Sequence, residues 1–191
     1  MRTKYKPVQI ALHWLVFLLV VATYATIELR GYIPKSLPQH QWFTLLHFSF
    51  GASVLAMMVL RVFIRLMYVT PAINPAPKIW LHRLGELMHL AVYILFISIP
   101  ILGVLSLYFK GDAWTLFTLN MPVSFEHSLL LSKKIKSLHE LMANCGYYLI
   151  GLHAAAALFH HYCLHDNTLL RMIPGKKGMN TQGKKFPLTQ K

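Results

Sequence analysis

The sequence predicts an all-α membrane protein built as a bundle of four transmembrane helices. Of its 191 residues, 55% are hydrophobic and only 13% are charged, and the mean hydropathy is +0.47. Soluble domains carry about 25% charged residues, so we expect lipid to be the main solvent of this chain. Four stretches are long and apolar enough to cross a bilayer, which takes about 20 residues each.

The expected spans follow one another along the chain, and each contains histidine. They cover residues 10–27, 42–60, 87–109 and 141–164. His13 is the only strongly polar interior side chain of the first span, and His47 interrupts the second. The third contains His89 and also Pro100, which membrane helices tolerate because neighbouring helices satisfy the freed backbone groups. The fourth is rich in small residues, and Ala154–Ala157 would let a helix or a flat cofactor come close.

The basic residues indicate how the bundle is oriented. The formal net charge is +13, but the lysines and arginines lie in short clusters between apolar runs and do not cover one soluble face, so we expect no nucleic acid partner. Lysine and arginine favour the cytoplasmic side of a membrane protein. If both termini lie on that side, it carries Arg2, Lys4, Lys6, Arg61, Arg65, Lys78, Arg83, Arg171, Lys176, Lys177, Lys184, Lys185 and Lys191. These are 13 of the 19 basic residues, so we expect both termini to be cytoplasmic.

The rest of the chain connects or extends the spans. We expect residues 1–174 to form one membrane domain and residues 175–191 to form a basic, disordered tail close to anionic headgroups. The segment 110–136 between the third and fourth spans lacks helical periodicity at its start, so we expect it to fold partly over the mouth of the bundle. Cys145 and Cys163 lie in one predicted helix about 27 Å apart, which is too far for a disulfide.

The histidines carry the strongest functional signal, because titratable side chains inside a membrane are costly and are usually functional. His139 and His153 are 14 residues apart on the fourth predicted helix, about 40° short of four full turns. They therefore share a face and lie about 21 Å apart, a separation that fits two stacked haems. Haem iron accepts imidazole axially, and two facing histidines give a six-coordinate centre suited to electron transfer.

Each haem then needs a second histidine at the same depth. His13 matches His153 near the cytoplasmic side, and His47 matches His139 near the outer side. The sequence therefore predicts two haem b groups, each ligated by one of these pairs. Two other interpretations remain open. A single membrane histidine can be an interhelical hydrogen-bond partner. A ladder of histidines can also conduct a metal ion, although the intramembrane carboxylates common in such paths are missing.

A further group of histidines lies near the inner haem. His89 is at a depth similar to His13 and could replace it as a ligand, but we expect it to exchange a proton beside the inner haem. A quinone bound there needs hydrogen-bond partners and a proton source, and His89 with His160 could supply both. The alternative is that His160 belongs to an interfacial cluster with no specific role.

Three lysines stand at the outer mouth, directly before His139. Lys133, Lys134 and Lys136 are placed to attract a small anion toward the outer haem. Three other basic residues could extend this patch: Arg30, Lys35 and Lys110. The alternative is that the cluster only orients the chain in the membrane, although basic residues on the outer face run against the usual trend.

These residues resemble the bacterial cytochrome b561 family. The matching segments are IALHWLVFLLV, LLHFSFG, LMHLAVYILFISIPILG, SLHELMANCGYYLIGLHAAAALFHHY and DNTLLRMIP, which together reach nearly to Pro174. The specific features are the His-Trp pair near the start and the two histidines 14 residues apart. The basic tail departs from the short end typical of the most similar members.

The resemblance implies a four-helix membrane domain with two b haems at His13, His47, His139 and His153. For the small members that the chain resembles most, it also implies oxidation of superoxide at the periplasmic face and reduction of ubiquinone near the inner haem. The expected location is the bacterial inner membrane, with lipid, ubiquinone and superoxide as partners and no obligatory protein partner. Cytochrome b subunits of formate dehydrogenases and hydrogenases share the four histidines, so an electron-transfer subunit for a partner dehydrogenase is the alternative.

Overall fold

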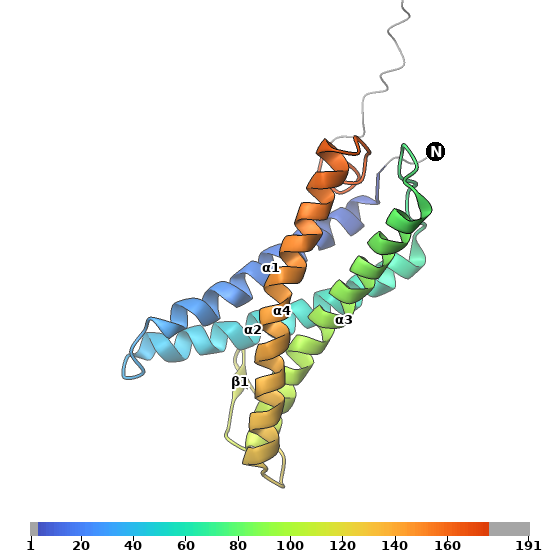
Figure 1. The fold of residues 1–191 in the computed structure, drawn as a ribbon. Coiled ribbons are helices and arrows are strands. Elements are labelled where there is room, and N and C mark those ends of the chain that lie inside the picture. Colours follow the sequence, from blue (N-terminus) through green and yellow to red (C-terminus); the bar gives the residue numbers. More distant parts are fainter. Residues whose placement is uncertain (1–3, 176–191) are drawn as a thin grey trace, which may run out of the picture.

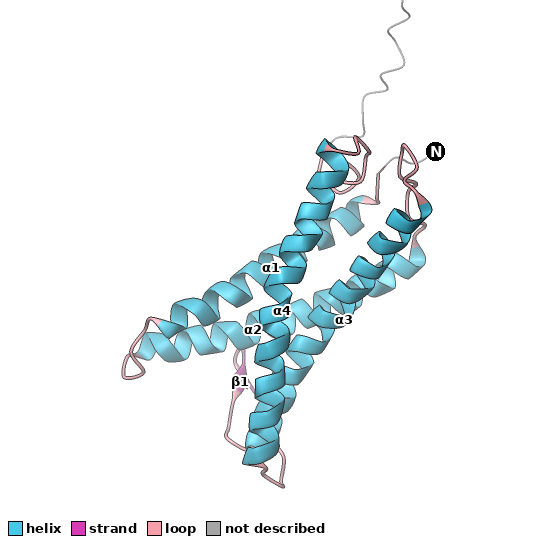
Figure 2. Ribbon diagram, in the orientation of Figure 1, coloured by secondary structure: helices cyan, strands magenta, loops and turns pink. Residues whose placement is uncertain are grey.

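The computed structural model describes residues 4–175 and contains four long helices and one short hairpin (Figures 1 and 2). The elements are α1 (Pro7–Gly31), α2 (Pro38–Met67), α3 (Ile79–Lys110), β1 (Thr115–Leu116), β2 (Leu119–Asn120) and α4 (Leu129–Tyr162). All four of these helices are long and apolar enough to cross a membrane. The predicted four-helix membrane fold is therefore confirmed.

Local sequence signals explain where the helices begin and end. Pro7 and Pro38 open α1 and α2 at the first helical position, where no backbone N–H is needed. Gly111 follows α3 in the left-handed conformation, with φ of 83°, a common way to end a helix. Before α4, the Ser128 hydroxyl accepts a hydrogen bond from the Leu131 amide at 3.3 Å.

Helix α4 begins 12 residues before the expected membrane span, which covers residues 141–164. The added segment Leu129–Glu140 carries lysines and continues the helix beyond the apolar stretch. At 1.5 Å per residue, the 34 residues of α4 extend about 51 Å, well beyond a hydrocarbon core of about 30 Å. His139 and His153 consequently lie on one continuous helix.

The helices pair as two hairpins that cross at an angle (Figure 1). Helix α1 packs along α2, α3 packs along α4, and α2 also contacts α3. Within the part of the chain that the structure describes, no Cα atom of α4 lies within 8 Å of one in α1 or α2. The buried apolar core comes from the first three helices and consists of Val16, Val20, Val54, Met58 and Phe96. Side chains alone therefore bridge the space between α4 and the first hairpin.

The start of α1, the α2–α3 loop and the segment after α4 meet at one end of the bundle (Figure 1). The Trp14 indole N–H donates to the carbonyl of Met172 at 2.8 Å. Asn74 and Asn167 exchange two hydrogen bonds between the loop and this segment. The described residues end at Gly175, so the tail that was expected to be disordered, residues 175–191, lies almost entirely outside them. The boundary at residue 174 stays a prediction.

The loop between α3 and α4 folds against the opposite end, as expected for segment 110–136. Its short hairpin pairs Thr115 with Asn120 and contacts α2. Trp114 is buried and its ring meets Phe48 edge to face, with ring centres 6.2 Å apart. The Phe117 amide donates to the Ser49 hydroxyl at 3.0 Å. These contacts fix the loop on the half of α2 that lies away from the chain termini.

Candidate functional site

The histidines predicted to lie inside the membrane meet in two groups at two depths. The ring centres of His47 on α2 and His139 on α4 are 6.4 Å apart. Nearer the chain termini, those of His13 on α1 and His153 on α4 are 6.3 Å apart. The structure therefore brings together the same residues that were paired by depth. In both groups the two rings come from helices whose backbones are not in contact.

In the outer pair, the helix backbone fixes both rings. Nδ1 of His47 lies 3.0 Å from the carbonyl oxygen of Thr23, and Nδ1 of His139 lies 2.8 Å from that of Ile99. A protonated Nδ1 donates to each carbonyl, which leaves both Nε2 atoms free to coordinate. Histidines that bind metals almost always hold their second nitrogen in this way. At Gly103, a Cβ atom would lie 3.2 Å from Cε1 of His139, so the glycine makes room for the ring.

The inner group contains three imidazoles. His89 on α3 lies beside His153, with ring centres 5.8 Å apart, so His153 has a neighbour on each of two other helices. Nδ1 of His13 is buried without a hydrogen-bond partner among the described residues. His89 is thus close enough to act on anything bound between His13 and His153.

The spacing of both pairs fits a shared metal better than a direct hydrogen bond. A metal–imidazole bond is about 2 Å long and the ring centre lies about 1 Å further, so two rings on one iron have centres about 6 Å apart. A direct hydrogen bond would bring the ring centres to about 5 Å. The described residues hold no cluster of three or more protein donors suited to a bare metal ion. Two imidazoles facing across a gap between helices suit a planar group that supplies its own remaining ligands.

A cavity of about 1160 Å³ adjoins the outer pair and has both His47 and His139 in its wall. Its charged lining residues are Glu28, Arg30, Lys35, Lys110, Lys136 and Glu140. Of the three lysines singled out in the sequence, Lys136 lines the cavity, whereas Lys133 and Lys134 do not. Lys136 pairs with Glu140 at 2.5 Å, but both side chains are more than half exposed, so solvent weakens this ion pair.

Two tyrosines bridge α1 and α4 in the wall of the same cavity, a contact that sequence reasoning missed. The Tyr24 hydroxyl donates to the carbonyl of Ala143 at 2.7 Å, and its ring lies 4.3 Å from that of Tyr147. The Tyr147 hydroxyl donates to Glu28 at 2.8 Å. A Cβ atom at Gly146 would lie only 2.3 Å from the Tyr24 hydroxyl, so the glycine is needed for this approach. A tyrosine bonded to a helix carbonyl leaves no pattern in the sequence.

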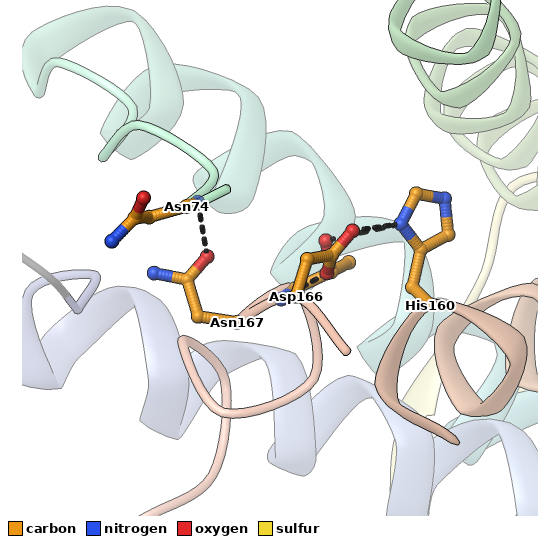
Figure 3. Close-up of polar contacts among 5 residues, drawn as sticks. Asn74, His160, Asp166 and Asn167 are labelled. Atoms are coloured by element: carbon orange, nitrogen blue, oxygen red, sulfur yellow. Dashed lines mark hydrogen bonds and ion pairs between the residues drawn. The ribbon is translucent and has the colours of Figure 1, made fainter. Parts of the chain in front are cut away.

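At the end of α4 nearest the termini, His160 meets a carboxylate (Figure 3). Nδ1 of His160 donates to Asp166 at 2.5 Å, and the Thr168 amide donates to the other carboxylate oxygen at 2.8 Å. Burial alone would raise the pKa of Asp166, but the hydrogen bonds from His160 and Thr168 outweigh it and hold the pKa below its ordinary value. The bonded partner of His160 is therefore Asp166, while His89 lies with His153.

Comparison with known proteins identifies the family of the chain. The family described as prokaryotic cytochrome b561 matches residues 4–175. The chain is 46% identical over 178 residues to the probable superoxide oxidase CybB of Yersinia pestis, covering 93% of this chain and 100% of that protein. It is 39% identical over 174 residues to cytochrome b561 homolog 1 of Escherichia coli K12, covering 91% of this chain and 99% of that protein.

A more distant relative is cytochrome b562 of Cereibacter sphaeroides, 29% identical over 174 residues that make up 88% of this chain and 94% of that protein. The family implies haem b, and the four apolar helices indicate a multi-pass membrane protein. The resemblance seen in the histidine segments is thereby confirmed, and the chain belongs to the prokaryotic cytochrome b561 family of membrane cytochromes.

Proposed function

We propose that this chain is a di-haem cytochrome b of the bacterial inner membrane that oxidises superoxide to dioxygen at the periplasmic face and reduces ubiquinone on the inner side. Two superoxide anions lose one electron each and leave as dioxygen, while one ubiquinone gains two electrons and two protons. The observation that carries the proposal is the occurrence of two interhelical histidine pairs, with ring centres 6.4 and 6.3 Å apart. The name of the relative from Yersinia pestis supports the choice of superoxide as electron donor.

In this proposal the histidine pairs hold the haems, with His47 and His139 at the outer site and His13 and His153 at the inner site. When bound, haem b supplies an iron that takes up and releases one electron at a time. The carbonyls of Thr23 and Ile99 orient the outer rings and increase the basicity of the ligating nitrogens.

The outer cavity collects the anionic substrate. Its wall combines four basic with two acidic residues, so a small anion is attracted toward His47 and His139. Lys136 contributes from the wall, and Lys133 and Lys134 add positive potential from the same end of α4. Steering of this kind is weakened by salt, because solvent ions screen charges beyond about 10 Å at 0.1 M ionic strength.

The inner residues serve the protons that quinone reduction requires. His89 lies next to His153 and can exchange a proton with a quinone bound near the inner site. The hydrogen bond from His160 Nδ1 to Asp166 leaves its Nε2 free to act on a second proton. His160 is seven residues after His153, so it lies about 10 Å closer to the end of α4 on nearly the same face.

The proposed orientation places the chain termini in the cytoplasm. The start of α1, the α2–α3 loop and the end of α4 gather at one end of the bundle (Figure 1). Within residues 4–175, seven of the 13 lysines and arginines belong to these segments or the helix ends beside them, and basic residues favour the cytoplasmic side: Lys4, Lys6, Arg61, Arg65, Lys78, Arg83 and Arg171. The outer cavity then opens on the periplasmic side.

The test is to mix the purified holoprotein with a superoxide generator and a short-chain ubiquinone and to follow quinol formation. We expect catalysed reduction that superoxide dismutase suppresses, and two haems per polypeptide from the haem assay. His139→Ala protein provides the matched control, since it lacks a ligand of the outer site. A rate no higher than the protein-free rate would reject superoxide as donor and favour an electron-transfer subunit for a partner dehydrogenase.

A further inference from the structure

Three side-chain nitrogens in the described part of the chain are buried without a hydrogen-bond partner: His13 Nδ1, Trp114 Nε1 and Arg171 Nε. Of these residues, only Trp114 lines the outer cavity. A buried donor without an acceptor costs about 1–3 kcal/mol, and most buried polar groups in proteins are paired. The Trp114 indole therefore calls for an acceptor that comes from whatever fills the cavity.

The indole is held firmly in place. Its residue is only 8% exposed, and its ring stacks edge to face on Phe48. The Trp114 carbonyl accepts a hydrogen bond from the Met121 amide at 3.0 Å, and the adjoining hairpin is tied to Ser49 through the Phe117 amide. Turning the ring out to water would break this packing, so the side chain stays at the cavity wall.

The charges around the cavity specify the kind of acceptor. Both carboxylates in the wall already have partners, because Glu28 accepts from Tyr147 and Glu140 pairs with Lys136. Lys110 likewise pairs with Asp112 at 2.6 Å, so Arg30 and Lys35 are the basic wall residues outside these ion pairs, and they leave the wall with a net positive charge that favours an anionic occupant. A neutral N–H that donates to an anionic oxygen forms a stronger bond than one that donates to a neutral acceptor.

We propose that the Trp114 indole N–H binds an anionic oxygen of the group that occupies the outer cavity. This inference rests on the proposed function, which places a haem at His47 and His139 and superoxide in the same cavity. Two sources share the required chemistry: a carboxylate of the bound haem, and the superoxide anion itself. In either case Trp114 is a binding residue supplied by the α3–α4 loop.

The experiment compares the wild-type holoprotein with Trp114→Phe and with Trp42→Phe, a matched control at the outer end of α2 where Trp42 is 71% exposed. Ultraviolet resonance Raman spectra report whether an indole N–H is hydrogen-bonded, and the wild type minus Trp114→Phe difference isolates Trp114. Phenylalanine keeps an aromatic ring against Phe48 and removes only the donor and part of the ring.

If the acceptor is the haem carboxylate, Trp114 is hydrogen-bonded in the resting holoprotein. Trp114→Phe then lowers the reduction potential of the outer haem, because a less compensated negative charge favours ferric iron. If the acceptor is superoxide, the potential stays constant and the second-order rate constant with superoxide falls about tenfold. Reduction by an uncharged quinol is then unchanged, and Trp42→Phe changes none of these quantities.

An indole N–H that is free in the wild-type holoprotein, together with an unchanged potential and an unchanged superoxide rate in Trp114→Phe, would overturn the proposal. Should Trp114→Phe fail to bind haem, a second comparison uses the wild type alone. Its spectra with and without haem still decide whether the indole gains a hydrogen bond. Loss of superoxide activity in the wild type itself would reject the proposed function. The hydrogen bond from Trp114 to a haem carboxylate could still be tested in that case, because the spectra and the reduction potential are measured without superoxide.

Discussion

The outer and inner groups both consist of histidines, but in different surroundings. At the outer pair, both Nδ1 atoms are tied to helix carbonyls, and a cavity of about 1160 Å³ with mainly basic charge adjoins the rings. At the inner group, His13 Nδ1 has no partner in the described chain, and a third imidazole, His89, lies next to His153. None of the inner histidines lines the outer cavity.

The difference follows the chemistry proposed for each end. Oxidation of superoxide needs access and positive potential but no proton donor, and the outer site offers space and charge. Reduction of a quinone needs two protons, and titratable groups beyond the ligand pair occur at the inner end as His89 and the His160–Asp166 pair. The two sites are therefore distinguished by the residues around the ligands.

The largest effect should come from removing one ligand at a time. We expect His139→Ala to lose the outer haem and keep the inner one, and His153→Ala to do the reverse, because each haem needs both axial imidazoles. The measurement is haem per polypeptide together with the reduced absorption spectrum. His161→Ala is the control, since His161 lies on α4 outside both pairs. Retention or loss of both haems in His139→Ala would show that the two sites are not separate.

A second substitution tests whether the extra inner imidazole serves protons. We expect His89→Gln to keep both haems and to slow quinone reduction roughly 100-fold, a usual effect of losing an acid–base group. The initial reduction of the protein by superoxide should be unaffected, because it takes place at the other end. Loss of the inner haem in this variant would instead make His89 the axial ligand in place of His13.

The membrane spans and the histidine pairs could be predicted because polar residues are rare inside lipid. Each of His13, His47, His89 and His153 interrupts an apolar run, and the helical repeat then fixes its face and depth. The extension of α4 beyond its apolar span could not be predicted in the same way, since Leu129–Glu140 is helical without being apolar. An apolar run predicts which part of a helix lies inside lipid, but it does not predict how far the helix continues outside.

Most features of the site that could not be predicted from the sequence are contacts between side chains and the backbone. The carbonyl partners of His47 and His139 depend on how the helices pack, and no side-chain type marks them. Trp114 lies in a loop whose hairpin is set by tertiary contacts with α2. The helical repeat of α4 separates two lysines that are close in sequence, since Lys134 and Lys136 point about 160° apart.

A smaller effect should follow from crowding a single outer ligand. In Gly103→Ala the new methyl would meet Cε1 of His139 at 3.2 Å, so the ring must shift slightly. We expect an altered low-spin signal and reduction potential of the outer haem, with the inner haem unchanged. Gly85→Ala is the matched control on the same helix, because nothing lies within 4 Å of its added methyl. A change in the inner haem alone would contradict the assignment of His139 to the outer pair.

The smallest effect is expected from removing one hydrogen bond between α1 and α4. The Tyr24 hydroxyl joins α1 to the carbonyl of Ala143, which lies on α4 between His139 and His153. Tyr24→Phe removes this bond and keeps the ring against Tyr147. Hydrogen bonds between membrane helices contribute about 0.6 kcal/mol on average, so unfolding of the holoprotein in mixed micelles should show a loss of that order.

Ala143 lies about one turn from His139 and nearly three turns from His153, so removal of this contact should shift the reduction potential of the outer haem slightly and that of the inner haem less. Tyr148→Phe is the matched control, since Tyr148 is 82% exposed on α4 and has no hydrogen bond to α1 among the described residues. A larger shift at the inner haem would contradict the position of this contact beside the outer pair. The helix packing between α1 and α4 would then have to support the inner site more than the outer one.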